Sequence, residues 1–264
     1  MSGWIDYDEA FEGGAERIVG TVKVLRDVHS PQLGNARDIL VYLPPSYASA
    51  NRTYPTLYMH DGQNLFDEAT SFAGEWKVDE TLESLAREGI EAIVVGIPNT
   101  GRDRLAEYSA FHDHRFGGGR AEAYLRFVVE TVKPRVDESF RTTGEREATG
   151  TIGSSMGGLI SLYALFERPE VFGLAGAVSP SVGFARHAPL DYLETVKFVG
   201  GRIYLDVGTH EGIPVRAVRE ARDLLAGKGY SLGKDLLYVE DEGGRHDEAS
   251  WAARLPSALR FLLG

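Results

Sequence analysis

The chain contains no cysteine, which excludes disulfides, thiolate metal sites and cysteine nucleophiles. It also has no cluster of Lys or Arg, and its formal net charge of -11 argues against a nucleic-acid partner, because binding phosphates needs a basic surface. No apolar run approaches the roughly 20 residues of a membrane span, and the first dozen residues lack the basic and apolar regions of a secretory signal. We therefore expect a cytoplasmic protein that binds neither nucleic acid nor a membrane.

The overall composition is that of an ordinary globular protein, with 43% hydrophobic and 25% charged residues. A chain of 264 residues predicts one domain spanning residues 1–264. Segments typical of strands alternate with helical ones, which indicates an α/β fold with a mostly parallel sheet covered by helices on both faces. The predicted strands are 56–60, 90–97, 147–152, 172–178, 202–207 and 235–239, and the predicted helices are 78–87, 121–132, 156–166 and 214–226.

Two further features concern the ends of the chain. The β-rich segments 17–25 and 37–43 are joined by a polar connection with Pro and Gly, so we expect an antiparallel hairpin at one edge of the sheet. Residues 251–262 carry an apolar stripe that Pro256 interrupts, which predicts two short helices or a kink.

The most informative motif lies at residues 153–157, which read Gly-Ser-Ser-Met-Gly. This G-x-S-x-G pattern stands between a predicted strand and a predicted helix, as it does in a nucleophile elbow, where a strained turn exposes the central Ser. Ser155 is therefore the predicted nucleophile. Ser154 competes for the role, but it occupies an x position, where we expect its side chain to face the scaffold.

A Ser hydroxyl needs a neighbouring base, and the base needs an orienting acid. In the α/β-hydrolase order the His follows the last strand, which favours His246 over His187 and His210. For the acid we favour Glu211, in the loop after the strand at 202–207. Asp206 is the alternative, although a position inside the strand points it toward the sheet.

An oxyanion hole needs two fixed backbone N–H donors. One is expected from Met156, the residue after the nucleophile. The second is expected from the loop after an early strand, where residues 60–63 read His-Asp-Gly-Gln. We predict that Gln63 supplies this donor, with Gly62 as the alternative.

Several motifs together resemble the putative-esterase (esterase D-like) family of α/β-hydrolases. They are residues 42–47, 57–66, 74–79, 153–158 and 205–211, together with His246 followed by Trp251. The resemblance implies a Ser-acid-His triad on Ser155, Glu211 and His246, and an oxyanion loop at residues 61–63. Residues 97–104 resemble a loop of the siderophore-esterase branch, so siderophore and feruloyl esterases are the most similar members.

Three side chains are candidates for binding substrate. Arg102 and Arg104 would steer an anionic or catechol-bearing substrate, or else form salt bridges within their loop, for example with Glu107. Trp76 would line an acyl pocket, although a large aromatic side chain equally suits the core.

The sequence therefore predicts a serine carboxylester hydrolase that works through an acyl-enzyme on small-molecule esters, with no cofactor and no metal. An acyltransferase with the same triad is the alternative within enzymes. A binding module that keeps the fold without catalysis is the alternative from another class.

Overall fold

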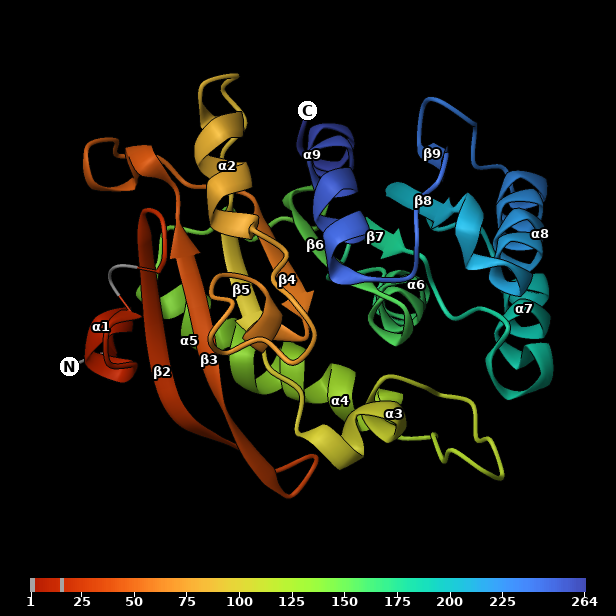
Figure 1. Ribbon diagram of the computed structural model, residues 1–264, viewed down its shortest axis with the longest axis horizontal. Coiled ribbons are helices and arrows are strands. Elements are labelled where there is room, and N and C mark those ends of the chain that lie inside the picture. Colours follow the sequence, from red (N-terminus) through yellow and green to blue (C-terminus); the bar gives the residue numbers. More distant parts are fainter. Residues whose placement is uncertain (1–2, 15–16) are drawn as a thin grey trace.

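The computed structural model describes residues 3–14 and 17–264 (Figure 1). Within these residues the strands are β1 (Trp4–Asp6), β2 (Thr21–Ser30), β3 (Asn35–Leu43), β4 (Thr56–His60), β5 (Ile93–Ile97), β6 (Thr149–Ser154), β7 (Leu174–Val178), β8 (Arg202–Gly208) and β9 (Leu236–Asp241). The helices are α1 (Tyr7–Ala10), α2 (Val78–Ala86), α3 (Arg104–Glu107), α4 (Ala121–Arg126), α5 (Lys133–Ser139), α6 (Met156–Glu167), α7 (Phe184–Thr195), α8 (Ile213–Lys228) and α9 (Glu248–Leu263).

All of these strands join one sheet in the order β1-β2-β3-β5-β4-β6-β7-β8-β9. The pairs from β1 to β5 in this order are antiparallel, and the pairs from β5 to β9 are parallel. The sheet is therefore mixed and mostly parallel, with the predicted β2–β3 hairpin near one edge. Strand β1 extends that edge and was not predicted from the sequence.

Helices cover both faces of the sheet (Figure 1). Buried residues of α2 and α9, such as Leu82 and Leu259, form one core with the near face of the sheet. Residues of α4 to α8 form two clusters on the opposite face. Neighbouring residues of β8 alternate between the faces, since Tyr204 joins the first core and Leu205 a cluster opposite.

Two predictions about helices need correction. Helix α9 runs without a break from Glu248 to Leu263, so the division into two short helices at Pro256 is wrong. The buried residues of α9, from Trp251 to Leu262, pack on the sheet, and this packing outweighs the backbone hydrogen bond that Pro256 removes. The helix predicted for 121–132 continues through a π-helical stretch, Phe127–Val132, into α5.

Among the helices of residues 3–14 and 17–264, none combines the length and the apolar character needed to cross a bilayer.

Candidate active site

The side chains predicted to act together follow the carboxyl ends of neighbouring parallel strands. Ser155 follows β6, Glu211 lies in the turn after β8, and His246 comes after β9. The carboxyl ends of parallel strands meet at one edge of the sheet, which is where α/β proteins place their ligand sites. The topology therefore brings together three loops that are far apart in the sequence.

Ser155 lies on a sharp turn between β6 and α6. Its backbone has φ 56° and ψ -118°, a conformation that residues with a side chain rarely adopt. The turn is tight, because a Cβ at Gly153 would come within 2.8 Å of the backbone carbon of Gly157. The Ser155 N–H donates to the carbonyl of Val178 at 2.9 Å, which ties the turn to β7. Because Ser155 immediately precedes α6, the positive end of the helix dipole lies beside its hydroxyl.

His246 forms hydrogen bonds with both Ser155 and Glu211. Its Nε2 is 3.0 Å from Ser155 Oγ, and its Nδ1 is 2.7 Å from Glu211 Oε2. A proton on Nδ1 satisfies both bonds, because Nδ1–H donates to the carboxylate and Nε2 accepts from the hydroxyl. The arrangement can therefore move the Ser155 proton to the imidazole while Glu211 stabilises the imidazolium that forms.

The second carboxylate oxygen of Glu211 is also held in place. Oε1 accepts hydrogen bonds from Ser179 Oγ at 2.6 Å and from the Gly208 N–H at 2.7 Å. Burial raises the pKa of Glu211, but hydrogen bonds from His246, Ser179 and Gly208 outweigh it and keep this pKa below the ordinary value. The carboxylate is therefore ionised and able to fix the orientation of the imidazole.

A buried ion-pair network supports this carboxylate from behind. Arg254 of α9 is 5% exposed and donates to Asp206 at 2.8 Å, to Ser179 Oγ at 2.7 Å and to Asp241 at 3.1 Å. Its guanidinium also lies 3.6 Å from Glu211 Oε1. Arg254 thus holds the Ser179 hydroxyl that in turn holds Glu211.

Sequence reasoning missed both Ser179 and Arg254, although each had a signal. Ser179 directly follows β7, in the same position that Ser155 has after β6. Arg254 lies three residues after Trp251, on the otherwise apolar stripe of the terminal helix. A charged residue on a buried stripe indicates a charged partner inside the protein.

The structure also places the alternative acid, Asp206, and the alternative bases, His187 and His210. Asp206 is buried and accepts hydrogen bonds from Arg254, from Tyr204 and from the Ser179 N–H. Burial raises its pKa, and these donors act against that rise. The imidazole bonded to Ser155 Oγ is that of His246, not that of His187 or His210. Geometry therefore favours Glu211 and His246 over the alternatives.

A cavity of about 710 Å³ opens in front of Ser155 and His246. Gln63 lines it from a short turn after β4, and Met156 is the first residue of α6, where N–H groups have no partner within the helix. A Cβ at Gly62 would come within 2.6 Å of the Gly96 backbone, so the turn before Gln63 requires glycine. The oxyanion role of Gln63 and Met156 remains a prediction. Gln63 lies in the turn after β4 and Met156 lies at the start of α6, which are the two positions expected for the donors.

Trp76 belongs to the core, and the cavity lining does not include it. Its side chain is 3% exposed and packs against Trp251, with the ring centroids 6.0 Å apart. Trp251 is the tryptophan that lines the cavity. Its ring meets the imidazole of His246 edge to face at 5.0 Å, and its N–H donates to Ser179 Oγ at 3.2 Å. Of the two roles considered for Trp76, the structure favours packing.

The two arginines differ from each other. Arg104 lines the cavity, but Asp61 binds its guanidinium through two hydrogen bonds of 2.7 Å. The suggested salt bridge to Glu107 is wrong, because the buried Glu107 carboxylate pairs with Arg37 at 2.9 Å. The side chain of Arg102 is 92% exposed, and Arg102 is not among the residues that line the cavity. Arg104 therefore stabilises the loop that carries Gln63, and Arg102 does not contact the site.

Comparison with known proteins decides the family. Residues 30–262 match the family model for a putative esterase. The chain is a member of the putative esterase family. This esterase is therefore a hydrolase of the carboxylesterase type, as its sequence predicted.

The relatives of this esterase include proteins of different specificity. The Bacillus subtilis protein YbbA is 28% identical, with 88% of this chain and 94% of YbbA covered. An endo-1,4-beta-xylanase/feruloyl esterase of Xylanibacter ruminicola is 27% identical over 88% of this chain and 30% of that protein. The enterobactin esterase FES of Shigella flexneri superposes with a TM-score of 0.72 at 22% identity, covering 91% of this chain and 58% of FES. These similarities confirm the predicted α/β-hydrolase fold.

Proposed function

We propose that this esterase hydrolyses small-molecule carboxylic esters through an acyl-enzyme on Ser155. One observation carries the proposal: Ser155, His246 and Glu211 form a continuous chain of hydrogen bonds, with the serine on a strained turn. Such a chain activates a hydroxyl that is otherwise a weak nucleophile.

The proposed mechanism has two steps. Ser155 Oγ attacks the ester carbonyl as its proton moves to His246 Nε2, and the N–H groups of Met156 and Gln63 stabilise the oxyanion. The proton then passes from His246 to the departing alkoxide, which leaves as the alcohol. In the second step His246 takes a proton from water as the water oxygen attacks the acyl group. The bond to Ser155 Oγ then breaks, His246 returns the proton to Oγ, and the acid is released. The imidazole is 39% exposed, so water can reach the acyl-enzyme, which favours hydrolysis over transfer to another acceptor.

The cavity suggests uncharged or aromatic esters as substrates. Phe72 and Trp251 supply aromatic surface there, and Asp61 neutralises the charge of Arg104. We therefore propose a neutral ester, and the named specificities of the relatives make feruloyl esters and siderophore trilactones the first to test. A series of p-nitrophenyl esters of increasing acyl length would define the size of the acyl pocket.

Labelling with a fluorophosphonate tests the proposed nucleophile. We expect the wild-type protein to gain one covalent phosphonate, seen by mass spectrometry, and Ser155→Ala to gain none. Ser154→Ala is the matched control and should be labelled within a few-fold of the wild-type rate, although Ser154 also lines the cavity. An unlabelled wild-type protein would support the non-catalytic binding module, and products formed with added alcohols or thiols would support the acyltransferase.

Loss of the Arg104 side chain should impair catalysis for every ester. Arg104→Ala removes the ion pair that fixes Asp61, and a displacement of about 1 Å in the neighbouring Gln63 can cost about 100-fold in rate. We expect kcat/KM to fall by about 10- to 100-fold for neutral and anionic esters alike. Arg102→Ala, two residues away and exposed, is the control and should change kcat/KM less than about twofold. A loss confined to anionic esters would instead show that Arg104 binds the substrate charge.

Two further predictions extend the proposal. We propose a single domain over residues 1–264, because every strand of the described residues joins one sheet. The cytoplasmic location stays a prediction.

A further inference from the structure

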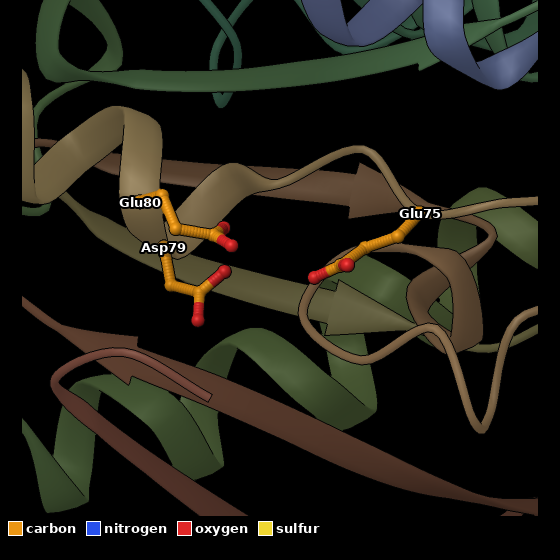
Figure 2. Close-up of side chains that lie close together, drawn as sticks. All are labelled: Glu75, Asp79 and Glu80. Atoms are coloured by element: carbon orange, nitrogen blue, oxygen red, sulfur yellow. The ribbon is translucent and has the colours of Figure 1, made fainter. Parts of the chain in front are cut away.

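Three carboxylates converge at the start of α2, in a place that the proposed catalysis does not use. Asp79 and Glu80 lie in the first turn of α2, and Glu75 reaches toward them from the preceding loop (Figure 2). One oxygen of each lies within 4.8 Å of the others. Acidic residues are common at the start of a helix, where they favour the dipole. That effect does not account for Glu75, which comes from outside the helix.

Each of the three carboxylates has a buried oxygen that no protein donor reaches. These oxygens are Glu75 Oε1, Asp79 Oδ1 and Glu80 Oε2. Asp79 is 0% exposed, and only its other oxygen is satisfied, by the Val19 N–H at 2.7 Å. No ion pair within residues 3–14 and 17–264 involves any of the three side chains. Buried carboxylate oxygens without a donor are costly unless a proton or a cation binds them.

We propose that Glu75, Asp79 and Glu80 bind one divalent cation of the Ca²⁺ type. The three oxygens lie within 4.8 Å of one another, which is close enough for one Ca²⁺ ligated at about 2.4 Å. A set of carboxylate oxygens is the kind of ligand that a hard cation such as Ca²⁺ binds. Glu75 and Glu80 also line a cavity of about 800 Å³, which provides a path of entry and room for water ligands.

The charged side chains around Glu75 do not neutralise the three carboxylates. Asp67 and Glu68 on the preceding loop add negative potential at Glu75, and Lys77 offsets part of it. Asp67 is itself paired with Arg17 at 2.8 Å.

A cation here would stabilise one wall of the active-site cavity. Phe72 and Ala73, which line that cavity, lie just before Glu75 in the sequence. A Cβ added at Gly74 would lie 3.2 Å from Glu248 Cβ, so Gly74 lies beside Glu248, which lines both cavities. The cation would thus connect the loop of residues 66–77 to α2. This inference does not depend on the proposed catalytic residues, because binding can be measured without a substrate.

Calorimetric titration with CaCl₂ after treatment with EDTA tests the site. We expect one Ca²⁺ per chain and a rise of several degrees in Tm at millimolar Ca²⁺. Glu75→Gln and Glu80→Gln should each weaken binding at least about tenfold. Glu68→Gln, which removes an exposed carboxylate from the same cavity, is the matched control, and its loss of negative potential at Glu75 should weaken binding less than about threefold. Absence of binding to the wild-type protein, or an equal loss in Glu68→Gln, would overturn the proposal.

The pH dependence of Tm separates a cation from a shared proton. Burial and the neighbouring carboxylates raise the pKa of Glu75 to about 7 and that of Asp79 to about 8. Without Ca²⁺ the native cluster therefore holds protons that the unfolded chain has released, so Tm should fall as the pH rises from about 5 to about 9. Ca²⁺ competes with those protons, so its effect on Tm should grow over the same range. A fall in Tm that Ca²⁺ does not reverse would show that the cluster binds protons alone.

Discussion

Replacing Ser155 or His246 with alanine should lower kcat by at least about 1,000-fold, and the double variant should lose little more. The reason is that the two side chains act as a unit, joined by the 3.0 Å hydrogen bond between Nε2 and Oγ. Once either is absent, the other has no proton transfer to perform. Steady-state hydrolysis of a p-nitrophenyl ester by the three variants measures the effect.

Losses that add in the double variant would mean that the two residues act independently, and the proposed mechanism would then fail. Ser154→Ala is the control, because this neighbouring serine is buried and does not bond His246. We expect it to retain activity within a few-fold of the wild type. Unfolding curves of the wild type and the four variants show whether any loss reflects a damaged fold.

Replacing Arg254 with methionine should destabilise the protein by about 3–5 kcal/mol, because it leaves the buried carboxylate of Asp206 without its cation. Methionine keeps most of the volume, so the effect reports the lost charge rather than a cavity. Urea unfolding measures the free energy. In the protein that remains folded, kcat should fall more than KM rises, because Ser179 loses one donor and holds Glu211 less firmly.

Arg260→Met is the matched control for this prediction. Arg260 lies on the same helix and pairs with Glu88 at 2.7 Å, but both side chains are about half exposed. Solvent screens an ion pair this exposed, so it adds little to stability and this variant should remain near wild-type stability. Equal destabilisation by both substitutions would show that Arg254 acts through helix packing and not through its buried partners.

Much of the fold could be predicted from the sequence because its signals are local. Strand β4 has the predicted bounds, and α6 begins at the predicted residue, Met156. Apolar runs, flanking turns and the elbow motif are all contained within short windows. Strand β1 escaped prediction because three residues carry too little pattern, and pairing with β2 is what makes them a strand. The sequence shows that Pro256 removes a backbone hydrogen bond, but it does not show how α9 packs on the sheet. The prediction of two short helices therefore gave too much weight to Pro256.

Part of the candidate site could likewise be predicted from the sequence, and part of it could not. Chain order and strand ends selected Ser155, Glu211 and His246, and the structure places His246 within hydrogen-bond distance of both Ser155 and Glu211. The partner of Arg104 was misjudged because Glu107 is near in sequence, whereas Asp61 is near only in space. Glu75, Asp79 and Glu80 are close in sequence, but their convergence gave no signal, because the path of the loop before α2 turns Glu75 toward the helix.

The backbone at residue 155 has a consequence for how such a protein changes over time. Its positive φ would suit glycine better than serine, and the strain is of the order of 1–3 kcal/mol. The proposed nucleophile is therefore maintained at a cost in stability. A homologue that no longer needs catalysis would become more stable if glycine replaced the serine at this position. Glycine here would therefore be expected in a homologue that has lost the activity.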